Sequence, residues 1–235
     1  MKKFISLLFL SSVLFASEYY AKLEPVHSYN MKASVSGKVI EVNDKAEATT
    51  VDSSLIVRID SKVDKIDLKQ SNIKLKSLRS ILKIEKGVLE SFKKISSKSK
   101  FDKDNQRIKI LNIESSISDL ITKIEKLNDT IEKKILIENN KYIYNIAVQK
   151  GDYVNPGTLL YTAMDTTKGK LEIFIPVKDA KTIKEKTIFI DGVKTDFKID
   201  KLYSVADAKH ISSYKCEIII PEPKLLSRLV KIEFK

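Results

Sequence analysis

The chain has 235 residues, of which 43% are hydrophobic and 31% are charged, and its formal net charge is +12. This composition can bury a core, which excludes wholesale disorder, and only 6 Gly and 5 Pro exclude collagen-like or mucin-like chains. A single cysteine, Cys216, excludes an internal disulfide and a zinc site built from several thiolates.

The N-terminus has the layout of a secretory signal. Lys2 and Lys3 precede an apolar run from Phe4 to Ala16 that only serines interrupt, and polar residues follow. The run is short for a membrane span. We therefore expect residues 1–16 to be a signal peptide, with retention as an N-terminal anchor as the alternative. A secreted chain of this charge meets anionic lipid, acidic proteins or cell-wall polymers rather than nucleic acid.

The segment from Tyr29 to Asp60 has a strand-like sequence, because β-branched and aliphatic residues cluster in two groups. The first group surrounds Gly37, and the members of the two groups are Ala33, Val35, Val39, Ile40 and Val42, then Leu55, Ile56, Val57 and Ile59. We expect short β-strands here.

The segment from Ser61 to Asn139 has a helical sequence, with no Pro and a single Gly, Gly87. Its second half carries a heptad seam, broken only by Lys134, of Ile110, Ile113, Ile117, Leu120, Ile124, Leu127 and Ile131. Its first half offers a matching arm, broken by Glu85, of Leu75, Leu78, Leu82, Leu89 and Phe92, widened by Ile81, Ile84, Val88 and Ile95.

The two helical arms are joined by a polar stretch. Ser96 to Asn105 is rich in Lys, Ser and Asp, and Phe101 is its only apolar residue. We therefore expect a turn here and two antiparallel helices, each about 50 Å long. Since two arms cannot close a helical bundle by themselves, the hairpin should project as a coiled coil, with pairing between copies as the alternative.

From Lys141 to the C-terminus the sequence is again strand-like. β-branched and aromatic residues return, and turn signals stand at Lys150-Gly151-Asp152, Asn155-Pro156-Gly157 and Asp191-Gly192.

This order of elements resembles the periplasmic adaptor (membrane fusion) proteins of tripartite efflux pumps and type I secretion systems. Val35 to Val42 looks like the first half of their lipoyl-type domain. Tyr144 to Leu160 looks like the second half, with the pattern Gly-Asp-x-Val-x-x-Gly-x-x-Leu starting at Gly151. In this motif Gly151 and Asp152 suit a tight turn, and Val154 should point inward.

The resemblance implies an elongated α+β fold. A lipoyl-like β-sandwich (29–60 and 140–167) is interrupted by a long antiparallel coiled-coil α-hairpin (61–139) and followed by a small β-barrel (168–235). In the barrel segment Leu171, Ile173 and Ile175 alternate, and 177–185 is predicted to be one short helix. The predicted strands of this segment are 187–190, 193–199, 214–220 and 229–234.

The hairpin tip carries a third match. Ser97 to Asp102 is similar to the Ser-Lys-x-x-aromatic-Asp segment with which many adaptors restart their second helix. The resemblance implies that this tip binds an outer-membrane channel, with Ser97 as a helix cap or a contact; the implied contact residues are Ile95, Ser97, Lys98, Lys100, Phe101 and Asp102. The Arg that precedes the Ser in such families is absent, so Lys93, Lys94, Lys98 or Lys100 would supply the charge.

The sequence offers little for catalysis or cofactors. His27 and His210 are the only histidines, and no nucleophile-elbow motif surrounds Asp207, His210 and Ser212, so we predict no enzyme activity. A lipoate or biotin carrier is disfavoured because the hairpin replaces the lysine-bearing turn. Cys216, Met31 and Met164 are expected to be packing residues rather than a reactive thiol or soft metal ligands, and no cofactor or metal is expected.

The resemblance implies a noncatalytic adaptor in the periplasm, associated peripherally with the inner membrane, that exports small molecules or ions. It would join an inner-membrane transporter of the RND type, held by the barrel, to an outer-membrane channel. Several copies would assemble through the lipoyl-like domain around a duct. The alternative is a self-associating coiled-coil envelope protein that binds cell wall or membrane and transports nothing. Substrate, copy number and a proton-driven or ATP-driven motor stay open.

Overall fold

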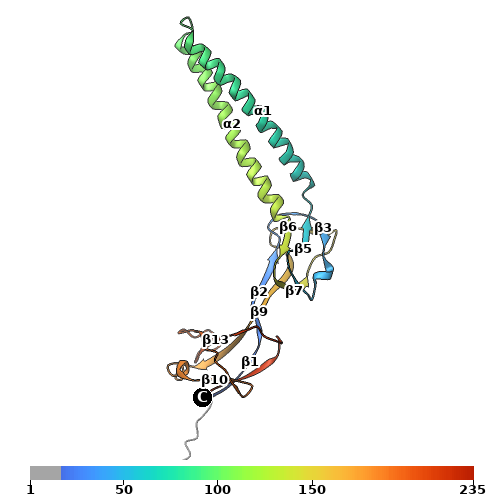
Figure 1. Cartoon of the computed structure of the whole chain (residues 1–235), viewed down its shortest axis with the longest axis vertical. Helices are drawn as coiled ribbons and strands as arrows, with labels where there is room; N and C mark the ends of the chain where they lie inside the picture. The colour runs from blue at the N-terminus through green and yellow to red at the C-terminus, as the bar shows by residue number, and fades with distance from the viewer. Residues whose placement is uncertain (1–16) are drawn as a thin grey trace, which may run out of the picture. The chain divides into compact units, whose positions relative to one another are not determined.

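The computed structural model describes residues 17–235, so the expected signal peptide lies outside the described residues. The chain divides into two compact units (Figure 1). Residues 30–162 form one unit, and the described residues up to Tyr29 form the other together with Ala163–Lys235. The strands β2 (Glu24–Lys32) and β9 (Leu159–Pro176) have residues in both units.

The 30–162 unit brings the two halves of the split β domain together. Its elements are β3 (Gly37–Val42), η1 (Asp44–Ala46), β4 (Thr50–Val51), β5 (Ser54–Ile59), β6 (Ile135–Glu138), β7 (Lys141–Ile146) and β8 (Tyr153–Val154). One sheet has the order β6-β5-β3-β8, and β4 pairs with β7. Gly37 lies opposite Val154, and the Gly151 amide donates to the Val39 carbonyl at 2.9 Å. The chain segments on either side of the hairpin therefore form one β domain.

The Gly-Asp motif builds the turn that its residues predict. Gly151 has a φ of 108°, a value that glycine adopts without steric cost, and the Asp152 carboxylate accepts a hydrogen bond from the Gln149 amide at 2.8 Å. The next residue but one, Val154, is buried. The turn and the inward side chain are confirmed.

Gly37 is required by close packing rather than by an unusual φ. A Cβ at this position would stand 2.5 Å from Cγ2 of Ile59, a fully buried β-branched side chain that cannot swing aside. We predict that Gly37→Ala lowers the free energy of unfolding by about 2 kcal/mol. Gly87→Ala is the matched control, because nothing lies within 4 Å of its Cβ, and it should stabilise α1 by about 0.5–1 kcal/mol. Urea unfolding measures both, and equal effects would contradict this account.

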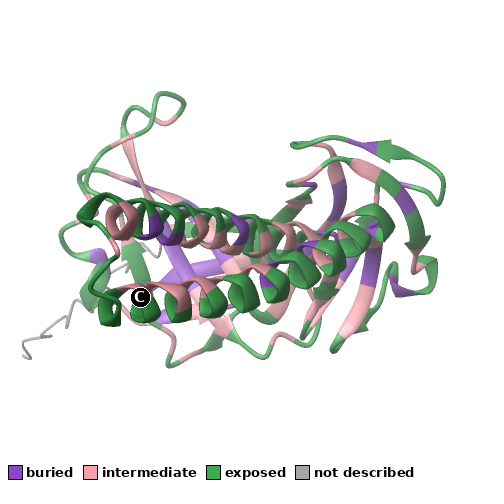
Figure 2. Cartoon of the chain, turned by 90° about the horizontal axis from the view of Figure 1, so that it is seen from above, coloured by how far each residue is buried: buried purple, intermediate pink, exposed green. Residues whose placement is uncertain are grey.

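The helical segment forms an antiparallel pair, α1 (Lys62–Lys94) and α2 (Lys100–Lys133), which pack along their length. The predicted seam residues on α2 are all buried or half-buried, and so are the five principal apolar residues of α1. Figure 2 shows the outer faces of both helices largely exposed. The predicted widening of the α1 face is wrong for Ile81, Ile84 and Ile95, which are exposed, because one partner helix covers only one face. The helical segment is also shorter than predicted, since 135–138 form β6.

The second unit has strands in two sheets around one core. Its elements are β1 (Ser17–Lys22), η2 (Ile183–Glu185), β10 (Ile188–Ile190), β11 (Val193–Lys194), β12 (Ile199–Leu202), β13 (Ser213–Pro221) and β14 (Leu229–Phe234). The strand orders are β1-β14-β10-β11 and β12-β13-β9. Leu171, Ile173 and Ile175 are buried in this core, so their predicted alternation is confirmed. The predicted order of split β domain, helical hairpin and C-terminal β unit is confirmed as well.

Two predictions in this unit are wrong. Residues 177–185 form successive turns, in which the amides of Asp179 and Thr182 donate three residues back, and only Ile183–Glu185 is helical, as a 3-10 turn. The segment is too short to repay helix nucleation, and burying Ile183 in the core fixes the turns instead. The predicted strand 193–199 is interrupted after Lys194 and resumes at Ile199.

Candidate functional site at the hairpin tip

The tip of the hairpin is a five-residue connection, 95–99, between α1 and α2. Ile95 ends α1 in an extended conformation, and its carbonyl accepts a hydrogen bond from the Lys98 amide at 3.3 Å. The Phe101 side chain, in the first turn of α2, is 73% exposed, and Ile95 is 44% exposed. Two large apolar side chains therefore face solvent at the end of a long rigid pair of helices.

A capping box starts α2. The Ser99 hydroxyl accepts from the Asp102 amide at 3.1 Å, and the Asp102 carboxylate accepts from the Ser99 amide at 3.2 Å. The helix cap is thus Ser99, and the prediction of Ser97 as the cap is wrong; a contact role for Ser97 stays a prediction. Asp102, predicted as a contact, has a structural task in holding the turn.

Hydrogen bonds from the Ser99 hydroxyl and then the Ser99 amide lower the pKa of Asp102. A lowered folded-state pKa means that this stabilisation is present above the unfolded value, about 3.9, and is lost as the pH falls through the lower folded value. We predict that Ser99→Ala raises the pKa of Asp102 toward its ordinary value in a carboxyl NMR titration. It should also weaken the cap by about 1 kcal/mol, seen as faster amide exchange in the first turn of α2. Ser97→Ala is the control, and an equal effect there would overturn the cap assignment.

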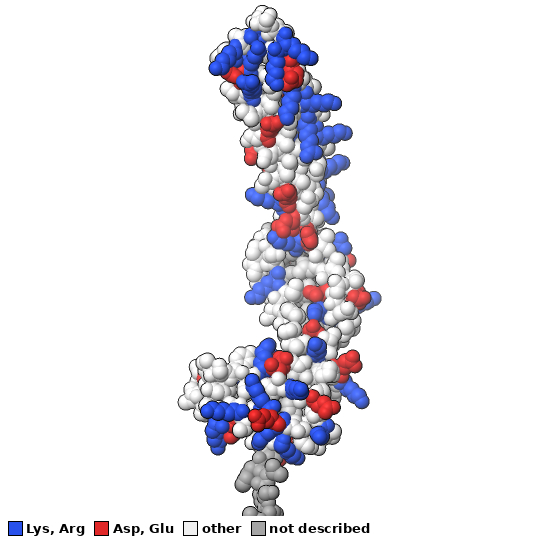
Figure 3. All heavy atoms as spheres, turned by 60° about the vertical axis from the view of Figure 1, so that its left-hand side comes forward, with Lys and Arg blue, Asp and Glu red and all other residues white. Residues whose placement is uncertain are grey.

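Basic residues are frequent at the tip that carries the exposed apolar pair. Figure 3 shows Lys and Arg gathered near the tip. The Lys98 ammonium lies over the Phe92 ring, 4.5 Å from its centroid, and Lys93 pairs with Glu90 at 2.6 Å. Lys98 and Lys100 make no ion pair within residues 17–235. Lys98 and Lys100 therefore have no acidic partner in the described chain, although Lys98 lies over Phe92, whereas Lys93 is already paired.

Glu85, which interrupts the apolar arm, joins the two helices below the tip. Its carboxylate accepts from the Gln106 amide group at 2.7 Å and pairs with Lys109 at 2.6 Å, and Gln106 also donates to the Glu85 carbonyl at 2.9 Å. The hydrogen bonds that the Glu85 carboxylate accepts from Lys109 and then from Gln106 lower its pKa. Sequence periodicity shows Glu85 only as a break in the apolar arm. Its partner Gln106 is buried on the seam side, one turn before Ile110, and a polar residue at that position is the signal that could have revealed the connection.

Lys134, the other break in the heptads, forms a similar connection at the base of the hairpin. Its ammonium pairs with Asp64 in the first turn of α1, and the Lys134 side chain is only 10% exposed. Its carbonyl accepts from the Ile59 amide at 2.8 Å. The end of α2 is thereby fixed both to the start of α1 and to β5.

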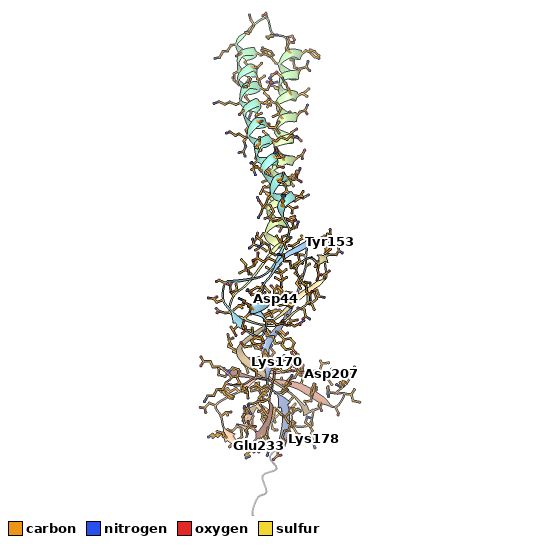
Figure 4. All side chains as sticks on the ribbon, turned by 90° about the vertical axis from the view of Figure 1, so that its right-hand side faces the viewer. Asp44, Tyr153, Lys170, Lys178, Asp207 and Glu233 are labelled. Carbon is orange, nitrogen blue, oxygen red and sulfur yellow. The ribbon has the colours of Figure 1, made fainter. Side chains whose placement is uncertain are left out.

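The histidine considered for catalysis takes part in packing. Asp207, labelled in Figure 4, lies in the loop between β12 and β13, and its carboxylate contacts Nδ1 of His210 at 3.1 Å. The His210 ring stacks on Phe174 with 3.5 Å between centroids. Within the described chain no hydrogen bond joins Ser212 to His210. These three residues therefore do not form a nucleophile with its base.

Cys216 is fully buried in the core of its unit, which raises the pKa of its thiol to about 12. The prediction of a small buried hydrophobic residue is confirmed. Among residues 17–235, no group of three or more His, Cys, Asp or Glu side chains is arranged to hold a metal ion. The described helices also include none that is long and apolar enough to span a bilayer.

The sequence matches no family profile and no curated protein. Solved structures do match. The chain superposes on MacA from Actinobacillus actinomycetemcomitans with a TM-score of 0.73 and 17% identity, covering 94% of this chain and 78% of MacA. For a MacA-MexA chimera with the Pseudomonas aeruginosa MexA α-hairpin, the TM-score is 0.69 and the identity 16%, with 94% of this chain and 81% of the chimera covered. For the membrane fusion protein Spr0693 from Streptococcus pneumoniae R6, the TM-score is 0.71 and the identity 9%, with 93% of this chain and 98% of Spr0693 covered.

These likenesses extend over nearly the whole chain and include the paired halves of the β domain and the helical hairpin between them. At these identities they concern the fold and not the partners of any one protein. The chain has the fold of the membrane fusion (periplasmic adaptor) proteins.

Proposed function

We propose that the protein is a noncatalytic periplasmic adaptor that links an inner-membrane transporter of the RND type to an outer-membrane channel. Its cargo would be small molecules or ions. The observation that carries the proposal is the hairpin tip: two helices locked together by Glu85 and Gln106 present Phe101 and Ile95, flanked by unpaired lysines, at the end of an adaptor fold. Exposed aromatic and aliphatic residues ringed by charge are typical of protein-binding surfaces.

The other parts are assigned by the same proposal. The lipoyl-like domain (29–60 and 140–167) would associate with its copies around a duct, the hairpin (61–139) would reach the channel, and the barrel (168–235) would bind the transporter. The protein would lie in the periplasm, associated with the inner membrane, and the transporter would supply the energy. A homo-oligomer follows because one hairpin cannot enclose a conduit.

A photo-crosslinking amino acid at Phe101 tests the tip directly in the native cells. We expect a crosslinked product in which mass spectrometry identifies an outer-membrane channel protein. The same amino acid at Thr122, on the outer face of α2, is the control and should give no channel product. Products containing only cell-wall fragments or only the chain itself would favour the envelope-protein alternative.

A further inference from the structure

α1 carries a second apolar row that α2 does not cover. Successive residues of a helix turn by about 100°, which places the five members of the row within an arc of about 80°, about 110° away from the seam that faces α2. The members and their exposed fractions are Val63 69%, Ile66 51%, Ile73 52%, Ile81 43% and Ile84 65%. This row is solvent-exposed in the single chain, although its residues are as apolar as those of the seam.

A row of lysines runs beside this apolar row. Lys62, Lys65, Lys69, Lys76 and Lys83 fall in the adjoining arc of about 60°. None of these five ammonium groups has an ion-pair partner in the described part of the chain. Neither arc contains an Asp or Glu between residues 62 and 84, a length of about 33 Å. We call the two rows together the α1 flank.

The charge of the hairpin decides what the α1 flank can meet. Residues 62–134 contain 19 Lys and Arg against 11 Asp and Glu, so a second copy brings the same positive excess. Several of the acids are already paired within the chain, as in Lys86–Glu114, Arg107–Asp104 and Lys133–Asp129. Figure 3 shows the basic side chains along one side of the hairpin. An anionic partner therefore fits better than another hairpin.

The apolar row distinguishes among anionic partners. A carboxylated glycan would satisfy the lysines but would leave the isoleucines in water. An anionic lipid surface satisfies both rows at once, because isoleucines can enter the boundary between headgroups and acyl chains while lysines lie at the phosphates. We propose that the α1 flank binds an anionic phospholipid surface.

The test uses the full chain with a local probe. A fluorophore sensitive to polarity is attached at Ile73→Cys, with Thr122→Cys on the outer face of α2 as the position control; Cys216 is buried and stays unlabelled. Because the probe reports only on its own surroundings, binding of the N-terminal apolar run does not change its signal. We expect phosphatidylglycerol vesicles to shift the emission at residue 73 to the blue, phosphatidylcholine vesicles to do so far less, and the residue 122 probe to stay unchanged.

Charge variants decide the role of the lysine row. Lys69→Gln, Lys76→Gln and Lys83→Gln together should weaken vesicle binding about a hundredfold, while the α2 triple Lys103→Gln, Lys126→Gln and Lys133→Gln, with the same change in net charge, should weaken it much less. Circular dichroism confirms that both triples keep their helices. The proposal would be overturned if phosphatidylglycerol gave no response or if the two triple variants lost equal affinity. It would also be overturned if the emission shifted on raising the protein concentration without vesicles, or with isolated cell-wall sacculi but not with vesicles. Tip crosslinking at Phe101 is read independently.

Discussion

Replacing Asp64 by alanine is expected to lower the free energy of unfolding by about 3 kcal/mol, because it leaves the Lys134 ammonium unpaired in a site that is only 10% exposed. An acid in the first turn of α1 is also favoured by the helix dipole, which the substitution removes. The loss should be seen in urea unfolding and as faster amide exchange where α2 meets β6.

A second variant separates loss of the ion pair from loss of packing. Lys134→Met keeps a similar volume without the charge, so the double variant Asp64→Ala with Lys134→Met should recover most of the lost stability. Asp129→Ala is the control, since its partner Lys133 is exposed and surface pairs contribute about 0–1 kcal/mol. If Asp64→Ala were as stable as the natural chain, the ion pair with Lys134 would contribute nothing to stability.

The two breaks in the heptads show where sequence periodicity reaches its limit. Period and polarity identify Ile110 to Ile131 as a seam, because burial against one partner repeats with the helix. The same pattern shows Glu85 and Lys134 only as exceptions, since their partners Gln106 and Asp64 lie 21 and 70 residues away. The seam position of Gln106 offers a signal for the Glu85 connection, but nothing in local spacing reveals that Lys134 joins two helices.

The β units were predictable where turn chemistry is strong. Gly151 and Asp152 specify a turn whose φ and hydrogen bonds admit few alternatives, so the second half of the split domain follows from its residues. The first strand, β1, was not predicted at all. Its residues pair with β14, more than 200 positions away, and only Ala21 and the half-buried Tyr19 face the core, so the segment carries no clear alternation of its own.

The sequence predicts where the tip lies but not which of its residues cap the helix. Ser97, Lys98, Lys100 and Phe101 were grouped with Asp102 on resemblance alone. The hydrogen bonds assign Ser99 and Asp102 to the cap, so a channel contact stays a prediction for Ser97, Lys98, Lys100 and Phe101. Serines two residues apart in a lysine-rich turn give equivalent local signals, so the choice between them depends on the backbone conformation.

Reversing the charge of Lys98 and Lys100 together, Lys98→Glu with Lys100→Glu, is expected to reduce export to the level of a strain that lacks the chain. The substitution changes the tip charge by four units beside Phe101. Folding should survive, because neither lysine makes an ion pair in the described structure and the capping box uses only Ser99 and Asp102. Export in cells and circular dichroism of the purified chain measure the two effects.

The matched control for this variant is Lys123→Glu with Lys126→Glu, which makes the same change in net charge at two exposed positions in the body of α2. Export should persist there if docking depends on the tip. Loss of export in both variants would mean that the overall charge of the hairpin matters rather than its end. If export stayed full with both tip lysines reversed and the photo-crosslink at Phe101 were retained, docking would be assigned to the apolar pair, Ile95 and Phe101. Replacing these two residues by serine would then have to abolish docking.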